Sequence, residues 1–170
     1  MILGISTSTF TLVHVVLSLV GIFAGLVVLF GMFSSKRLTG WTALFLATTV
    51  LTSVTGFFFP FDHLLPSHIV GILSLVVLAV AILALYAYDL ARAWRWIYVA
   101  GTLVALYLNV FVGVVQAFQK VPPLSALAPT QSEPPFVIAQ VVVLVIFIVL
   151  GVFAVRSFHP ELSAPASSAL

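Results

Sequence analysis

The sequence predicts an all-α membrane protein, built as a bundle of five transmembrane helices with the N-terminus outside and the C-terminus in the cytoplasm. Hydrophobic residues make up 63% of the chain and charged residues only 6%, whereas a soluble domain carries about 25% charged residues. The apolar residues form runs of about 20, the length that crosses a bilayer as a helix. The basic residues between these runs gather on one side, and this asymmetry orients the bundle.

The expected spans follow one another in a single domain, residues 1–160. Serines and threonines at residues 6–9 can cap the first helix, and Pro60 ends the second. Prolines also open the third helix and the fifth. We expect the spans near residues 8–33, 41–60, 67–88, 95–118 and 135–156.

Two segments outside the spans are predicted not to be helical. The connection 119–135 contains five prolines, so an irregular but stiff loop is expected there. The last residues, 161–170, are rich in serine and alanine. They are expected to form a disordered cytoplasmic tail.

The lysines and arginines predict which end of the bundle faces the cytoplasm. One side holds Lys36, Arg37, Arg92, Arg95 and Arg156, and the other side holds Lys120 alone. Cytoplasmic loops carry the excess of basic residues. The chain is therefore expected to be a multi-pass protein of the cytoplasmic (inner) membrane.

Several kinds of chemistry lack their usual sequence signals. The chain has no cysteine, which excludes disulfides and thiolate metal sites. It contains no Gly-rich phosphate loop, HExxH or GxSxG motif. No acidic residue falls within an expected span, so a proton relay of the carboxylate kind is missing. We expect a protein without catalytic machinery of its own, and no nucleic-acid partner.

Polar residues in the half of the membrane that holds the N-terminus are the candidate ligand-binding site. Polar groups in hydrocarbon are costly and suggest function, and the opposite half is expected to be aliphatic or aromatic up to the charged loops. A lipid-like or quinone-like ligand needs an apolar slot with one or two polar groups. The candidates are His14, Ser18, Thr52, Thr55, Asn109, Gln116 and Gln140.

A simpler interpretation of these residues stays open. Side-chain amides and hydroxyls often join transmembrane helices by hydrogen bonds worth about 0.6 kcal/mol each. His14 lies on one face of its helix with Ser18, Gly21 and Gly25, and small residues let another helix approach closely. We therefore expect His14 to face protein rather than lipid, beside Asn109 in an outward-opening pocket.

The short outer connection between the second and third spans holds candidate metal ligands. Asp62, His63 and His68 lie there, and copper, zinc and haem iron all accept imidazole. The alternative function is therefore a membrane redox protein that binds haem or copper through His14, His63 and His68. No standard ligand spacing is present, so a solvated loop is the simpler interpretation.

These observations favour a small integral membrane accessory or binding protein over an enzyme. Its expected partners are the lipid bilayer, a hydrophobic small molecule, and a larger membrane complex or further copies of the chain. The identity of any cofactor stays open between none, haem and copper.

Overall fold

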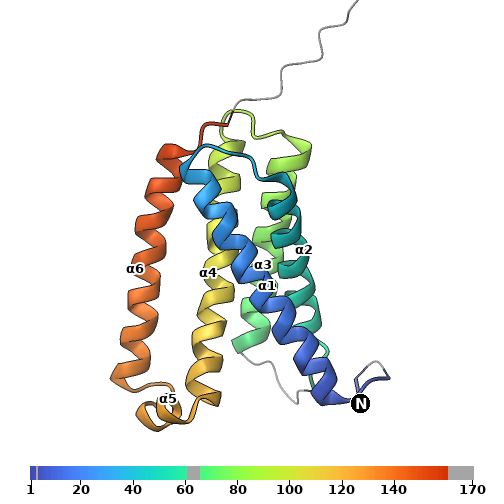
Figure 1. Cartoon of the computed structure of the whole chain (residues 1–170), viewed down its shortest axis with the longest axis vertical. Helices are drawn as coiled ribbons and strands as arrows, with labels where there is room; N and C mark the ends of the chain where they lie inside the picture. The colour runs from blue at the N-terminus through green and yellow to red at the C-terminus, as the bar shows by residue number, and fades with distance from the viewer. Residues whose placement is uncertain (3, 61–65, 161–170) are drawn as a thin grey trace, which may run out of the picture.

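A computed structural model describes residues 1–2, 4–60 and 66–160 of the chain. Within these ranges the structure is helical, with one isolated β-bridge between Ile2 and Ile5. Long helices run side by side along the longest axis of the molecule (Figure 1). The helical segments are α1 (Thr7–Phe33), α2 (Thr39–Gly56), α3 (Pro66–Ile82), the π-helix η1 (Leu83–Ala87), α4 (Trp94–Lys120), α5 (Pro122–Leu127) and α6 (Pro134–Ser157).

Four of these helices are long and apolar enough to cross a membrane: α1, α3 continued by η1, α4 and α6. The protein is therefore a multi-pass membrane protein. Helix α2 is not among the four, because six of its 18 residues are threonine.

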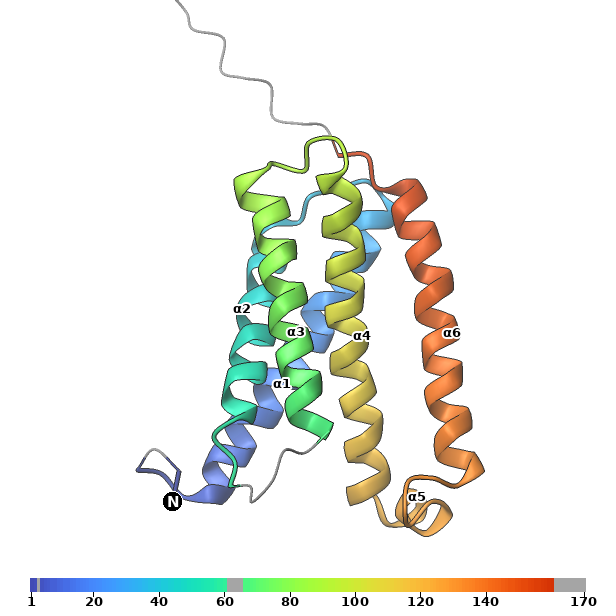
Figure 2. The same cartoon turned by 180° about the vertical axis from the view of Figure 1, so that it is seen from behind.

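Neighbouring helices in the sequence pack against one another. Helix α1 contacts α2, α2 contacts α3, α3 contacts α4, and α4 contacts α6. Helix α1 also crosses one face of the bundle diagonally, where it contacts α4 and α6 (Figures 1 and 2). Helix α6 is peripheral, and its apolar side chains are mostly exposed. Such a surface is suited to contact with lipid.

Close approach of α1 to its neighbours depends on two glycines. A Cβ atom at Gly25 would lie 2.6 Å from Cδ1 of Leu106 on α4 and 2.9 Å from the ring of Phe45 on α2. A Cβ atom at Gly21 would lie 3.2 Å from Oγ1 of Thr48. The prediction that this face of α1 meets other helices is confirmed.

The structure differs from the expected spans at the helix ends. Helix α2 ends at Gly56 rather than at residue 60, and N–H groups of Phe57 and Phe58 each bond a carbonyl three residues back. The third span is not a uniform α-helix up to residue 88. Its last turn is the π-helix η1, in which the N–H of Tyr88 bonds the carbonyl of Leu83 at 3.1 Å.

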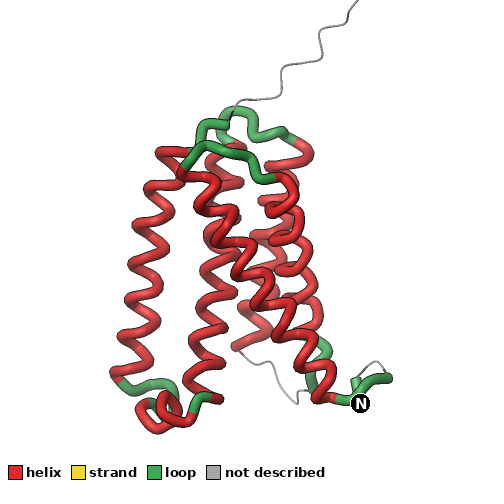
Figure 3. Tube along the Cα trace, in the orientation of Figure 1, coloured by secondary structure: helices red, strands yellow, loops and turns green. Residues whose placement is uncertain are grey.

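The proline-rich connection contains a short helix, α5, which corrects the expectation of an entirely irregular loop (Figure 3). Pro122 and Pro123 occupy its first turn. Proline suits that position because its φ angle is already helical and its missing N–H would have no partner there. The expected disordered tail, residues 161–170, lies outside the described residues.

Candidate functional site

His14 on α1 is held by Thr55 on α2. Nδ1 of His14 lies 2.8 Å from Oγ1 of Thr55. The ring also forms a T-shaped contact with the ring of Phe59, with the centroids 5.2 Å apart. His14 is half-buried, so its ring faces protein on one side, as expected from the stripe of small residues.

The hydrogen bonds of Thr55 are compatible with one particular tautomer of neutral His14. Oγ1 of Thr55 also lies 2.7 Å from the carbonyl oxygen of Leu51 and 3.1 Å from that of Thr52, so its hydroxyl group can donate to the backbone. When Thr55 donates to Leu51, its Oγ1 accepts from His14 and Nδ1 carries the proton of the neutral ring. Nε2 is left with its lone pair, and no residue in the described ranges bonds to it.

Asn109 on α4 reaches the line of contact between α1 and α2, here called the seam, on which His14 also lies, but at another depth. Its Nδ2 donates to Oγ1 of Thr49 at 3.2 Å, and a Cβ atom at Gly21 would lie 3.5 Å from Nδ2. Gly21 is seven residues from His14, which is two turns or about 10 Å along α1. The two side chains thus belong to one seam without lying next to each other.

Two further candidates line this seam. Ser18 donates to the carbonyl of His14 at 2.8 Å, which closes a turn of α1. The hydroxyl oxygen of Thr52 is buried and has no hydrogen-bond partner among the described residues. A buried hydroxyl without a partner is uncommon in a folded protein. The hydroxyl group of Thr52 can therefore bond a further polar group.

Gln140 and Gln116 lie elsewhere. Nε2 of Gln140 on α6 donates to the carbonyl of Phe111 on α4 at 3.2 Å, and its Oε1 is buried without a partner in the described part of the chain. Gln116 is exposed and contacts Gln119 at 3.5 Å. Gln140 therefore joins α6 to α4, and Gln116 belongs to the end of α4 that meets the α5 connection.

The candidate metal ligands are only partly within the described residues. Asp62 and His63 lie outside them. His68 on α3 is buried and stacks on Phe57 with centroids 5.6 Å apart, whereas His14 packs on Phe59 on the α1 side. Helix α2 packs between α1 and α3, so it separates His14 from His68. Within the described ranges no three His, Cys, Asp or Glu residues form a group that can hold a metal ion.

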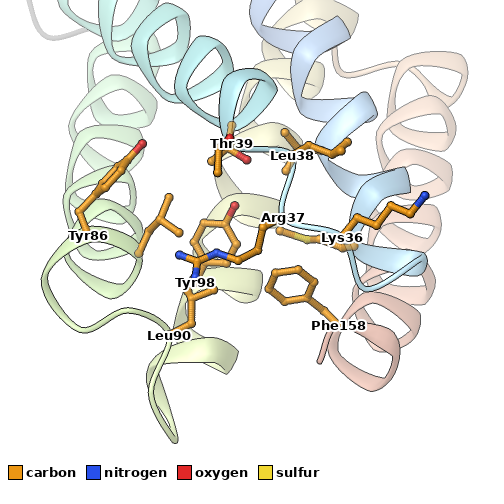
Figure 4. A pocket seen from close by; sticks show the side chains of 12 residues that line it. Lys36, Arg37, Leu38, Thr39, Tyr86, Leu90, Tyr98 and Phe158 are labelled. Atoms are coloured by element: carbon orange, nitrogen blue, oxygen red, sulfur yellow. The ribbon is translucent and has the colours of Figure 1, made fainter. Parts of the chain in front are cut away.

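The opposite end of the bundle holds polar residues that the sequence reasoning missed. Thr42, Tyr98 and Thr102 are 5%, 3% and 1% exposed, so that half is not purely aliphatic and aromatic. Tyr98 lies beside Arg37 and Phe158 in a cavity of about 60 Å³ (Figure 4). The sequence does contain a pattern that could have predicted the burial of Thr42. This residue lies six and seven residues before Thr48 and Thr49, on the threonine-bearing side of α2.

Comparison with protein-family models, with curated proteins and with solved structures finds no match for this chain. The geometry of its own residues therefore carries the functional argument.

Proposed function

We propose that all five long helices span the membrane, α2 included. The distribution of polarity around α2 supports this. Its buried side carries Thr42, Thr48 and Thr49, while its exposed side chains beyond the first turn are apolar. Thr48 bonds the carbonyl of Leu44 at 2.7 Å, and Thr49 accepts from Asn109. Polar groups that are satisfied inside the bundle leave an apolar surface for lipid.

The proposed orientation has the N-terminus outside and the C-terminus in the cytoplasm of a cell with an inner membrane. Lys36 and Arg37 follow α1, Arg95 opens α4, and Arg156 is in the last turn of α6. These helix ends lie together at one end of the bundle (Figure 1). Only Lys120, in the last turn of α4, lies at the other end. An excess of basic residues supports the cytoplasmic assignment.

We propose that the protein is a membrane accessory or binding subunit with a site for a lipid-like or quinone-like ligand around His14. The observation that carries this proposal is the hydrogen bond from Nδ1 to Thr55. It fixes the ring and leaves the Nε2 lone pair available. In the tautomer in which Nδ1 donates to Thr55, a ligand at Nε2 supplies the donor, such as the hydroxyl group of a quinol or of a lipid headgroup.

The second candidate function is a redox protein with haem or copper at His14. Metal-bound histidines usually donate their other ring N–H to a second partner, and the bond to Thr55 is of that kind. The position of α2 between His14 and His68 weighs against these two as a facing axial pair. A single histidine ligand, or one supplied by another subunit of a larger complex or homo-oligomer, fits the geometry better.

Ligand titration of the purified protein separates the two candidates. A short-chain quinol should raise the melting temperature, and His14→Phe and Thr55→Val should each weaken its binding about tenfold, equivalent to about 1.4 kcal/mol. Thr49→Val is the matched control on the same helix and should leave quinol binding unchanged. Equal quinol binding by all variants, or none by the wild type, would refute the quinol site. A Soret band or stoichiometric copper would establish the redox alternative.

A further inference from the structure

A second site lies at the basic end of the bundle, far from His14. The cavity of about 60 Å³ is enclosed by the end of α1, the start of α2, η1, α4 and the residue after α6. Its polar lining includes Arg37, Thr42 and Tyr98, and its apolar wall includes Leu85 and Phe158 (Figure 4). One water occupies roughly 10–15 Å³ on this measure. The space therefore suits a small oxyanion group and is too small for a quinone ring or a haem.

Arg37 offers that cavity an unsatisfied donor. Its Nη1 pairs with Oδ1 of Asp89 at 2.8 Å, but its Nε is buried and has no hydrogen-bond partner among the described residues. The guanidinium group can hold an oxyanion through two parallel N–H bonds. Asp89 is 58% exposed, and ion pairs of exposed side chains are weak. An incoming anion can therefore displace or share the contact with Asp89.

The backbone beside the cavity is unusual at three closely spaced positions. Asp89, Leu90 and Arg92 have φ angles of 42°, 58° and 51°, a region that residues other than glycine adopt rarely. They lie just after the π-helix η1, which ends at Ala87 and is capped by Tyr88. Such conformations concentrate at ligand clamps and functional sites. Here they hold Asp89 against Arg37 and bury Leu90 in the cavity wall.

We propose that this cavity binds the phosphate group of an anionic phospholipid. Arg37 gives it positive charge and Tyr98 gives it a hydroxyl group, while the ammonium group of Lys36 extends away from them at its rim (Figure 4). Its apolar wall and the aromatic side chains nearby, such as the stacked Tyr88 and Trp94, suit the boundary of a bilayer. Basic pockets between transmembrane helices on the cytoplasmic side are suited to anionic headgroups. The proposal is independent of the ligand at His14.

Native mass spectrometry and thermal unfolding of the delipidated protein in neutral detergent test the lipid site. Phosphatidylglycerol should bind stoichiometrically and raise the melting temperature, whereas phosphatidylcholine and inorganic phosphate at the same concentration should not. Arg37→Gln should reduce phosphatidylglycerol binding at least tenfold. Arg156→Gln removes the same charge at the same end but outside the cavity, and it should bind normally. Asp89→Asn removes the competing carboxylate and should tighten binding.

A second pair of variants protects the test against a folding defect of Arg37→Gln. Tyr98→Phe removes the hydroxyl group inside the cavity and should weaken binding several-fold. Tyr88→Phe removes a hydroxyl group outside it and should not. Equal losses in Arg37→Gln and Arg156→Gln would mean diffuse attraction and would overturn the site, as would equal binding by Tyr98→Phe and wild type. Stabilisation by inorganic phosphate equal to that by phosphatidylglycerol would overturn the lipid assignment.

Discussion

Gly25 and Gly21 differ in how tightly the surrounding side chains enclose them, although both lie on the same face of α1. The space for a Cβ atom at Gly25 is restricted by Cδ1 of Leu106 at 2.6 Å and by the ring of Phe45 at 2.9 Å, and the ring cannot move aside as the end of a flexible side chain can. At Gly21 the nearest atoms are the hydroxyl groups of Thr48 and Thr49, at 3.2 and 3.3 Å. The two positions therefore tolerate added volume differently.

We predict that Gly25→Ala destabilises the protein more than Gly21→Ala. Overpacking a well-filled interior costs about 1–3 kcal/mol, and Gly25→Ala should fall in that range. Gly40→Ala is the control, because a Cβ atom there meets nothing within 4 Å. Alanine in place of a helical glycine stabilises by about 0.5–1 kcal/mol, so this variant should be as stable as wild type or more so. Thermal unfolding in detergent measures the order, and equal melting temperatures for Gly25→Ala and Gly40→Ala would contradict it.

Helix α2 shows how threonines can line the inside of a membrane bundle. A threonine in a helix can donate its proton to a carbonyl of the preceding turn and still accept a bond from another helix. Thr55 is placed to do both, because its Oγ1 lies 2.7 Å from the carbonyl of Leu51 and 2.8 Å from Nδ1 of His14. Thr49 also accepts a hydrogen bond from another helix, from Nδ2 of Asn109 on α4. One polar side of α2 thus supplies acceptors to both α1 and α4.

A double-mutant cycle on Thr49→Val and Asn109→Leu measures the strength of this contact between α2 and α4. We expect a coupling energy of about 0.6 kcal/mol, the average for hydrogen bonds between transmembrane helices. The control cycle pairs Thr49→Val with His14→Phe. These two positions are about two turns apart and share no partner, so their effects should add. A coupling near zero for Thr49 and Asn109 would mean that their hydrogen bond contributes nothing to stability.

The topology of the molecule depends on whether α2 crosses the membrane. This is in question because its threonines lower its hydropathy. If α2 spans the membrane, the connection after α1 and the connection after α4 are separated by three crossings and face opposite sides. If α2 does not span, only α3 and α4 intervene and both connections face the same side.

Single cysteines introduced into this cysteine-free chain can tell these two topologies apart. Ser34→Cys lies after α1 and Ala126→Cys lies in α5, and both native side chains are exposed. In intact cells, a membrane-impermeant thiol reagent should label Ala126→Cys and leave Ser34→Cys unlabelled. After permeabilisation both should react, which controls for accessibility. Labelling of both positions in intact cells would rule out a crossing by α2, and the reversed pattern would invert the proposed orientation.

Local sequence patterns were sufficient to predict the membrane class, the approximate helix ranges and the contact face of α1. Hydropathy is a sum over neighbouring residues, and the face that holds Gly21 and Gly25 follows from 100° of turn per residue. Those properties need no knowledge of any other helix. The same patterns could not reveal the turn of π-helix at Leu83–Ala87, which depends on a shift of hydrogen-bond partners within an otherwise uniform apolar run.

The pairing of the polar side chains came from the three-dimensional arrangement alone. His14 and Asn109 share a seam, yet they bond to different threonines about two turns apart. The sequence of a helix does not determine how far that helix is shifted along its axis relative to its neighbour. Because lipid tails are as apolar as the helix surfaces, the fit of side chains between helices decides which helices become neighbours. The cavity at Arg37 depends on this most, since it unites separate segments from Val28 to Phe158 that only packing brings together.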